Sequence, residues 1–192
     1  MRGIYKLILE RRSIRKFKQK KILKSLLTKI INAARLAPSA ANLQITEFLV
    51  VDKEDLLKKI FPYTRWAGYL KGKGTPGENQ TPCAYVFILI SRERTSNPDL
   101  RDVGACAQNL ILTALSFGIA SCWLASIDRE SLKKLLKIPS KYELDSIVAL
   151  GYPAQKSKVK DTDFTVRYTQ DKESNLTVPK RPLNKVLHYN RI

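Results

Sequence analysis

The spacing of apolar residues along the chain predicts a series of helices. Over residues 22–36 the apolar side chains recur at three- and four-residue intervals, which is typical of a helix with one buried face. Pro38 ends this helix, because proline disfavours helical geometry in the residue before it. Further helices are expected over 54–61, over 102–117, and from the capping residue Asp128 to about Leu136. The helix over 102–117 is apolar nearly all round, which predicts deep burial or a place at an interface.

Runs rich in β-branched and aromatic residues predict strands at 45–52, 84–90, 119–125 and 144–152. The strand at 84–90 is apolar on both faces and is therefore expected at the centre of a sheet. Residues 62–82 are expected to form a long loop. From Pro153 the chain is polar and expected to be irregular, with some structure returning over 182–190. Helices and strands are mixed without a regular βαβαβ order, so we expect the α+β class, with one sheet covered by helices.

The composition narrows the class of protein. A chain of 192 residues with 44% hydrophobic residues predicts one domain over 1–192, with 153–192 as a C-terminal extension. We expect a cytoplasmic protein without a membrane segment, since no run approaches the roughly 18 apolar residues of a span and the start lacks a signal-peptide pattern. Three cysteines without a C-x-x-C spacing and a single histidine, His188, argue against a disulfide framework, a metal site and a Ser-His-Asp triad.

The formal net charge of +18 has two interpretations. One is a nucleic-acid-binding protein. The other, which we favour, is a lysine-rich surface, because the basic residues are spread from Arg2 to Arg191 and no nucleic-acid-binding motif accompanies them. A positive field also attracts phosphorylated cofactors.

Two segments contain candidate chemistry. RRSIR, residues 11–15, places three guanidinium groups and a hydroxyl close together, a set that suits phosphate oxygens. The alternative is a solvated basic stretch. PSAANLQ, residues 38–44, lies between a helix and a strand, and its small residues let a flat ligand approach the backbone. The amides of Asn42 and Gln44 suit a heterocycle with alternating donors and acceptors. The alternative is an ordinary turn.

Together these segments resemble the nitroreductase family of FMN enzymes, whose signature is an arginine–serine segment followed, after one helix, by P-S-x-x-N-x-Q. Three further segments follow in the family's order: D-x-G at 102–104 opening an apolar helix, Gly118 before a strand, and LGYP at 150–153 before a basic C-terminal segment. The resemblance spans essentially the whole chain, and five segments in the right order are more specific than any one of them.

The resemblance implies a three-layer fold with a central, mixed but mostly antiparallel sheet flanked by helices, in an intertwined homodimer whose C-terminal extension wraps the partner. It implies FMN as cofactor, NADH or NADPH as hydride donor, and a small-molecule electron acceptor such as a nitroaromatic, a quinone or a flavin. Transfer through flavin N5 would be ping-pong, without a catalytic side chain from the protein.

The resemblance also implies roles for individual residues. The FMN phosphate and ribityl chain would be bound by Arg11, Arg12, Ser13 and Arg15, with help from Lys180 or Arg181. The flavin in the partner subunit's site would be contacted by Pro38, Ser39, Ala40, Asn42 and Gln44, and the ring would pass Trp123, Leu124 and Ala125.

Several alternatives stay open at this point. The chain is either a reductase or a flavin-binding or flavin-processing protein without general reductase activity, and nucleic-acid binding is the third hypothesis. Trp123 is a flavin contact or a core residue. Asp102 is expected to be a helix cap rather than a catalytic acid, and Cys106 and Cys122 are expected in the core. The loop 62–82 is interpreted as a lid that controls the choice of acceptor.

Overall fold

The computed structural model describes residues 3–192, so residues 1 and 2 of the expected domain lie outside the described residues. The helices are α1 (Ile4–Glu10), α2 (Lys24–Ala34), α3 (Glu54–Ile60), α4 (Leu100–Ser116) and α5 (Arg129–Leu135). The strands are β1 (Phe17–Lys18), β2 (Thr46–Val51), β3 (Ala84–Ser91), β4 (Ala120–Leu124), β5 (Tyr142–Pro153), β6 (Ser157–Asp161), β7 (Thr169–Gln170) and β8 (Leu176–Lys180). Short 3-10 turns are η1 (Ala40–Asn42), η2 (Phe61–Tyr63), η3 (Gly68–Leu70), η4 (Glu78–Gln80) and η5 (Leu183–Lys185).

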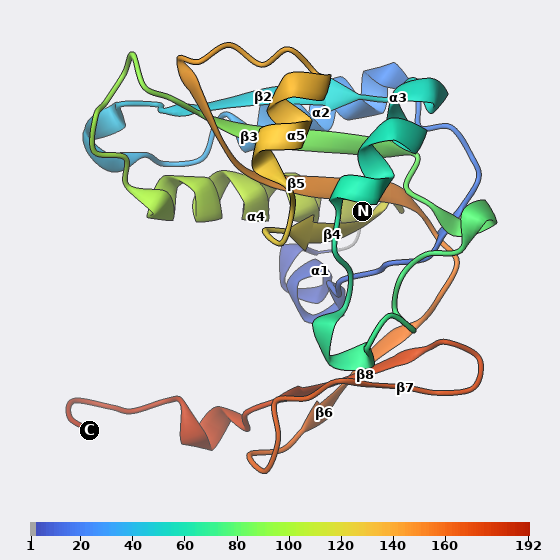
Figure 1. The fold of residues 1–192 in the computed structure, drawn as a ribbon. Helices are drawn as coiled ribbons and strands as arrows, with labels where there is room; N and C mark the ends of the chain where they lie inside the picture. The colour runs from blue at the N-terminus through green and yellow to red at the C-terminus, as the bar shows by residue number, and fades with distance from the viewer. Residues whose placement is uncertain (1–2) are drawn as a thin grey trace.

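The main sheet is organised around the long strand β5 (Figure 1). β5 pairs antiparallel with β3, β4 and, at its end, β1, while β2 pairs antiparallel with β3. The four strands predicted from composition and the predicted helices are all present, with ends shifted by only a few residues. The expected antiparallel sheet is therefore confirmed.

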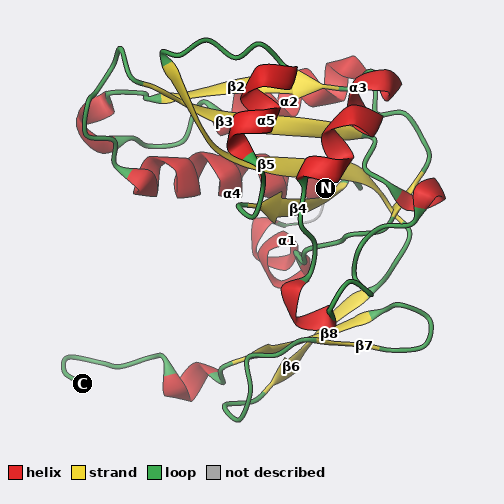
Figure 2. Cartoon of the chain, viewed as in Figure 1, coloured by secondary structure: helices red, strands yellow, loops and turns green. Residues whose placement is uncertain are grey.

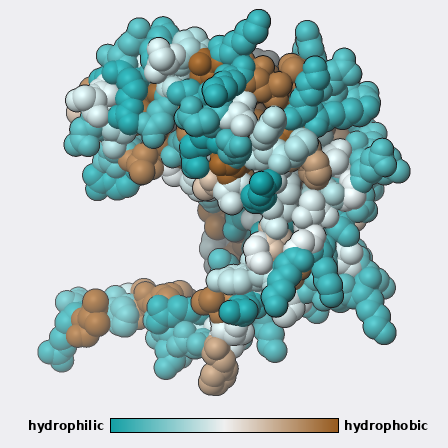
Figure 3. All heavy atoms as spheres, viewed as in Figure 1, coloured by the Kyte–Doolittle hydropathy of each residue, from teal (hydrophilic) through white to brown (hydrophobic). Residues whose placement is uncertain are grey.

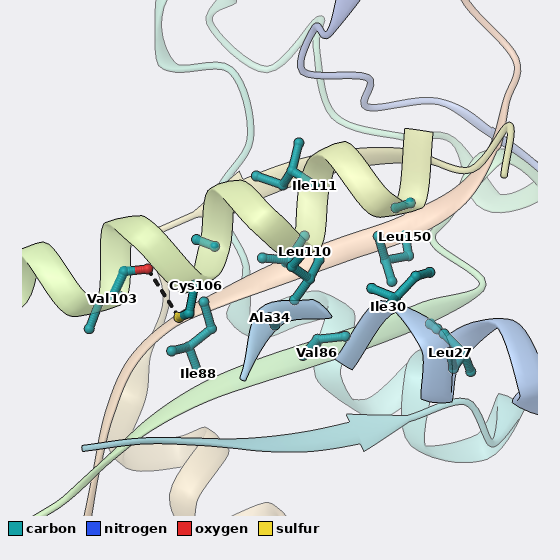
Figure 4. Close-up of a cluster of buried hydrophobic side chains, with 14 of the residues drawn as sticks. Leu27, Ile30, Ala34, Val86, Ile88, Val103, Cys106, Leu110, Ile111 and Leu150 are labelled. Carbon is teal, nitrogen blue, oxygen red and sulfur yellow. Dashed lines mark hydrogen bonds between the residues drawn. The ribbon is translucent and has the colours of Figure 1, made fainter. Parts of the chain in front are cut away.

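Helices cover both faces of this sheet, as Figure 2 shows. Along β3 alternate side chains belong to different clusters: Val86 and Ile88 pack with α2 and α4, whereas Tyr85 and Phe87 pack with α3 and α5. Figure 4 shows the first cluster, in which Leu110 of α4 meets side chains of α2 and the sheet. Because every side chain of β3 is buried, the prediction of a central strand and the three-layer α+β fold are confirmed.

The prediction that the chain is irregular after Pro153 is wrong. β6 and β8 pair in parallel and β7 pairs antiparallel with β8, forming a second, three-stranded sheet. These strands are short, and Ser157 of β6 pairs with Leu176 of β8, 19 residues further along the chain. The alternation of apolar and polar residues within a short window therefore does not predict them. We call residues 157–192 the C-terminal arm, because this segment extends away from the body with the C-terminus at its far end (Figure 1).

Large apolar side chains are exposed along the arm and along α1. Figure 3 shows apolar atoms gathered toward the end of the arm. The exposed side chains of the arm include Leu183, Val186, Leu187, Tyr189 and Ile192, and those of α1 are Ile4, Tyr5, Ile8 and Leu9.

No helix among residues 3–192 is long and apolar enough to cross a membrane. No group of three or more His, Cys, Asp and Glu residues there is arranged to hold a metal ion.

Candidate active site

Residues 11–15 follow α1, and their backbone amides are held by hydrogen bonds to β4 and to the side chain of Gln155. The Ile14 amide donates to the Ser121 carbonyl of β4 at 2.9 Å. The side-chain oxygen of Gln155 accepts from the amides of Arg15 at 2.6 Å and Lys16 at 3.1 Å. The Gln155 amide nitrogen in turn donates to the Ser174 carbonyl at 2.7 Å, which ties the segment to the C-terminal arm. No sequence pattern pointed to Gln155, since it lies 140 residues from Arg15.

A cavity of about 260 Å³, which we call the arginine pocket, opens beside this segment. It is lined by Glu10, Arg11, Arg12, Ile14, Leu115, Gly118, Ile119, Ala120, Ser121, Pro153, Gln155, Lys156 and Ser157. Arg12 Nε and Ser157 Oγ are buried and have no hydrogen-bond partner among residues 3–192. Burial, and then the neighbouring charge of Arg11, lowers the pKa of the Arg12 guanidinium. An anion with several oxygens would supply both the missing acceptor and the missing charge.

Ser13 and Arg15 lie beside the pocket rather than in its lining. Ser13 forms a bridge with Ser121 of β4. The Arg15 guanidinium lies 5.0 Å from the ring centre of Tyr168 in the C-terminal arm, and Tyr168 meets the ring of Tyr69 edge-on at 5.2 Å. Arg15, the loop 62–82 and the arm therefore come together at one point.

Residues 38–44 lie beside a second cavity, of about 210 Å³, which we call the loop pocket. Its lining is Ala34, Arg35, Ala37, Pro38, Ser39, Gln44, Thr46, Glu47, Arg94, Asp102 and Cys106. The side chains of 40–44 are exposed. Ala41, Asn42 and Gln44 have left-handed backbones, with φ of 48°, 55° and 51°. Such a conformation in non-glycine residues persists only where the surroundings enforce it.

Two side chains enforce the shape of this loop. Asp102 Oδ1 accepts a hydrogen bond from the Ala40 amide at 2.9 Å, and Ser39 Oγ accepts one from the Gln44 amide at 2.9 Å. The prediction that Asp102 caps α4 is wrong. The helix begins at Leu100, and its cap is Asp99, which accepts from the Arg101 amide at 3.0 Å. Both are aspartates near the helix start, so the sequence could not distinguish the cap from the loop holder.

The remaining predicted residues lie outside both cavities. Trp123 is 42% exposed and its indole nitrogen donates to Ser146 Oγ at 2.7 Å, so the alternative of a core tryptophan is wrong. Leu124 is buried in the core, and Ala125 is exposed at the end of β4. Lys180 and Arg181 lie on the C-terminal arm, where Arg181 Nε pairs with Asp163 at 3.1 Å. Cys106 and Cys122 are buried as expected, and burial raises the pKa of each thiol to about 11.

Within the described part of the chain, the two cavities share no lining residue. One chain alone therefore does not bring the residues of the RRSIR and PSAANLQ segments together. These observations define a protein of the α+β class with two separate candidate binding regions. One is a pocket lined by arginines, and the other is a strained, exposed loop.

Residues 8–74 and 76–152 match the nitroreductase family, and the chain belongs to that family. A protein of Archaeoglobus fulgidus described as a candidate NADH dehydrogenase/NAD(P)H nitroreductase is 32% identical over 170 residues, covering 85% of this chain and 92% of its own length. One of Methanothermobacter thermautotrophicus with the same description is 30% identical over 156 residues, covering 79% and 78%.

Solved structures share the fold. A nitroreductase family protein of Clostridium novyi NT has a TM-score of 0.68 and 27% identity, covering 79% of this chain and 87% of its own. A candidate nitroreductase of Desulfovibrio desulfuricans, solved in complex with FMN, has a TM-score of 0.72 over 100% of this chain and 99% of its own, at 23% identity.

Proposed function

We propose that this chain is an FMN-dependent NAD(P)H oxidoreductase that passes electrons to a nitroaromatic, a quinone or a flavin-like acceptor. The observation that carries the proposal is the arginine pocket, where Arg12 Nε is buried without a partner among the described residues. The nitroreductase fold around it, and relatives described as NAD(P)H nitroreductases, support the same reaction. A phosphate monoester is the anion whose oxygens suit this donor set.

The size of the pocket indicates which part of FMN it takes. Its volume of about 260 Å³ is below the roughly 300–1,000 Å³ of pockets that bury a whole ligand. The residues present fit the phosphate end: Arg11 and Arg12 would hold the phosphate, and Ser13 and Arg15 the ribityl chain. The ring would then lie outside the pocket, near Trp123 and its neighbours on β4.

The rest of the site would come from a second copy of the chain. In our proposal the single domain of 1–192 forms an intertwined homodimer, in which the segment 153–192 wraps the partner and Lys180 or Arg181 reaches the phosphate. The loop 38–44 would contact the flavin of the partner's site. The exposed apolar side chains of α1 and of the C-terminal arm support this arrangement, because a soluble monomer rarely exposes contiguous apolar surface.

FMN, when bound, supplies the chemistry, since its ring accepts two electrons from NAD(P)H and returns them to an acceptor. The protein binds and orients the cofactor, and no side chain needs to act as acid or base. We would expect the donor and the acceptor to bind in turn at the same place, which gives ping-pong kinetics.

The first experiment is a visible absorbance spectrum of the purified protein, before and after adding FMN and removing the excess. We expect a yellow protein whose absorbance falls with NADH or NADPH and recovers with an acceptor. Arg12→Ala should lose the colour, while Lys29→Ala, which removes an exposed cation from α2, should keep it. A wild-type protein that refuses FMN would overturn the proposal, and one that binds FMN tightly without reacting with NAD(P)H would favour a flavin-binding role.

A further inference from the structure

The buried carboxylate of Asp102 has no role in the chemistry proposed above. Asp102 is 7% exposed and lies in the first turn of α4, where Asp99 already serves as the cap. Its Oδ1 accepts from the Ala40 amide, 62 residues away in sequence, while its Oδ2 is buried without a hydrogen-bond partner in residues 3–192. Burying a carboxylate is costly, so a contact that retains it is expected to matter to the protein.

The bond from Asp102 acts at the point where the loop 38–44 changes direction. Ser39 is extended, with φ −134° and ψ 150°, and the left-handed residues Ala41 and Asn42 follow directly after Ala40. The Ala40 amide is thus the point at which α4 holds the loop before its strained part. The other tie, from Gln44 to Ser39, closes the loop on itself and does not connect it to a helix.

We propose that Asp102 is a positioning residue that shapes the loop 38–44 of its own chain for the flavin site of the partner chain. This inference rests on the proposed function and adds a specific direction: Asp102 acts across the dimer, whereas Arg12 acts within its own chain. The side chains of residues 40–44 are exposed and so are free to meet a second copy.

The first test compares FMN dissociation constants, measured by quenching of flavin fluorescence. Asp102→Ala should weaken FMN binding by roughly 10- to 100-fold, the range for losing a hydrogen bond to a charged group. Ala40→Pro removes the donor of the same bond, and proline is compatible with the extended Ser39 before it. If the two substitutions act by breaking the same hydrogen bond, their effects should not add. The double variant should then bind FMN as tightly as whichever single variant has the lower affinity.

Two further variants separate positioning from folding. Asp102→Asn keeps an oxygen acceptor and should restore most of the affinity, and it serves as the test if Asp102→Ala does not fold. Asp99→Ala removes the half-buried cap of the same helix but leaves the bond to Ala40, so it should lower thermal stability without changing FMN affinity.

The deciding experiment uses mixed dimers of Asp102→Ala and Arg12→Ala chains carrying different tags. If Asp102 serves the partner's site, one site of each mixed dimer is intact and the other carries both defects. We then expect one FMN per dimer at wild-type affinity, although neither parent binds well. Mixed dimers that bind no better than the parents, a monomeric protein, or an Asp102→Ala variant that binds FMN like the wild type would each overturn the inference. Failure of the wild type to bind FMN would instead overturn the proposed function.

Discussion

The arginine pocket and the loop pocket are built in different ways. Around the arginine pocket the backbone is held by a strand neighbour and by Gln155, and the Nε atom of Arg12 has no hydrogen-bond partner within residues 3–192. Around the loop pocket the backbone itself is strained, and it is held by the side chains of Asp102 and Ser39. The first site therefore offers charge on a fixed frame, and the second offers shape. Mutations in the first should change affinity for an anion, and mutations in the second should change geometry.

The largest expected effect comes from emptying part of the buried cluster in which Phe17 packs with Ile14 and Ala120, two residues that line the arginine pocket. Phe17 is fully buried, and a methyl group added at Gly151 of β5 would lie 2.7 Å from its ring. Phe17→Ala should lower the free energy of unfolding by about 3–5 kcal/mol, because it leaves a cavity. Urea unfolding at fixed protein concentration measures this. Leu23→Ala, at a side chain that is 64% exposed and lies outside α1 and the C-terminal arm, is the control and should change the free energy by no more than about 0.5 kcal/mol. If Phe17→Ala lowered the free energy of unfolding no more than the control does, Phe17 would not support this buried cluster.

The next effect sharpens the claim that the arginine pocket supplies charge. Arg12→Gln should raise the Kd for FMN by roughly 10- to 100-fold, the range for a charge-assisted hydrogen bond. The affinity for riboflavin, which lacks the phosphate, should stay unchanged. Fluorescence titration with both ligands measures this difference. Equal losses for the two ligands would show that Arg12 shapes the pocket rather than binding the phosphate.

A smaller effect tests whether Gln155 holds the backbone. Gln155→Ala leaves two amides without an acceptor, and each buried unsatisfied group costs about 1–3 kcal/mol. We expect faster hydrogen exchange at the amides of Arg15 and Lys16, with no change over residues 39–44. Gln155→Glu keeps the accepting oxygen and should protect both amides better than alanine does. Unchanged exchange in the alanine variant would contradict the role of Gln155.

The smallest effect concerns the helix that holds the loop pocket. Hydrogen bonds from Arg101 lower the pKa of Asp99 to about 2, below the usual value of roughly 3.9. Because the folded-state pKa is depressed, the stabilisation is present above the unfolded-state pKa and is lost as the pH falls toward 2. Asp99→Ala should lower Tm by a few degrees at neutral pH and reduce the dependence of Tm on pH below 4. Thermal unfolding across that range measures both, and parallel curves would contradict the cap.

The sequence predicted the main helices and strands of the body, though not α1 and β1, because their signals are local. Apolar spacing over 22–36 and the double-faced strand at 84–90 are consequences of burial that a short window records. The small sheet of the C-terminal arm escaped prediction because β6 and β8 are only five residues each and half-buried, and their pairing depends on residues far along the chain.

What the sequence determined by itself is the order of the main helices and strands between residues 22 and 153, the family, and which segments contain candidate chemistry, since residue type and spacing are local properties. Only the tertiary structure decided that Gln155 holds the arginine segment, that the Nε atom of Arg12 is buried without a hydrogen-bond partner among residues 3–192, and that Asp102 rather than Asp99 reaches the loop. Each of these depends on which groups, distant in sequence, come into contact and on how far the contact removes them from water. Distance, direction and desolvation are properties of the folded chain, and they do not follow from its local pattern.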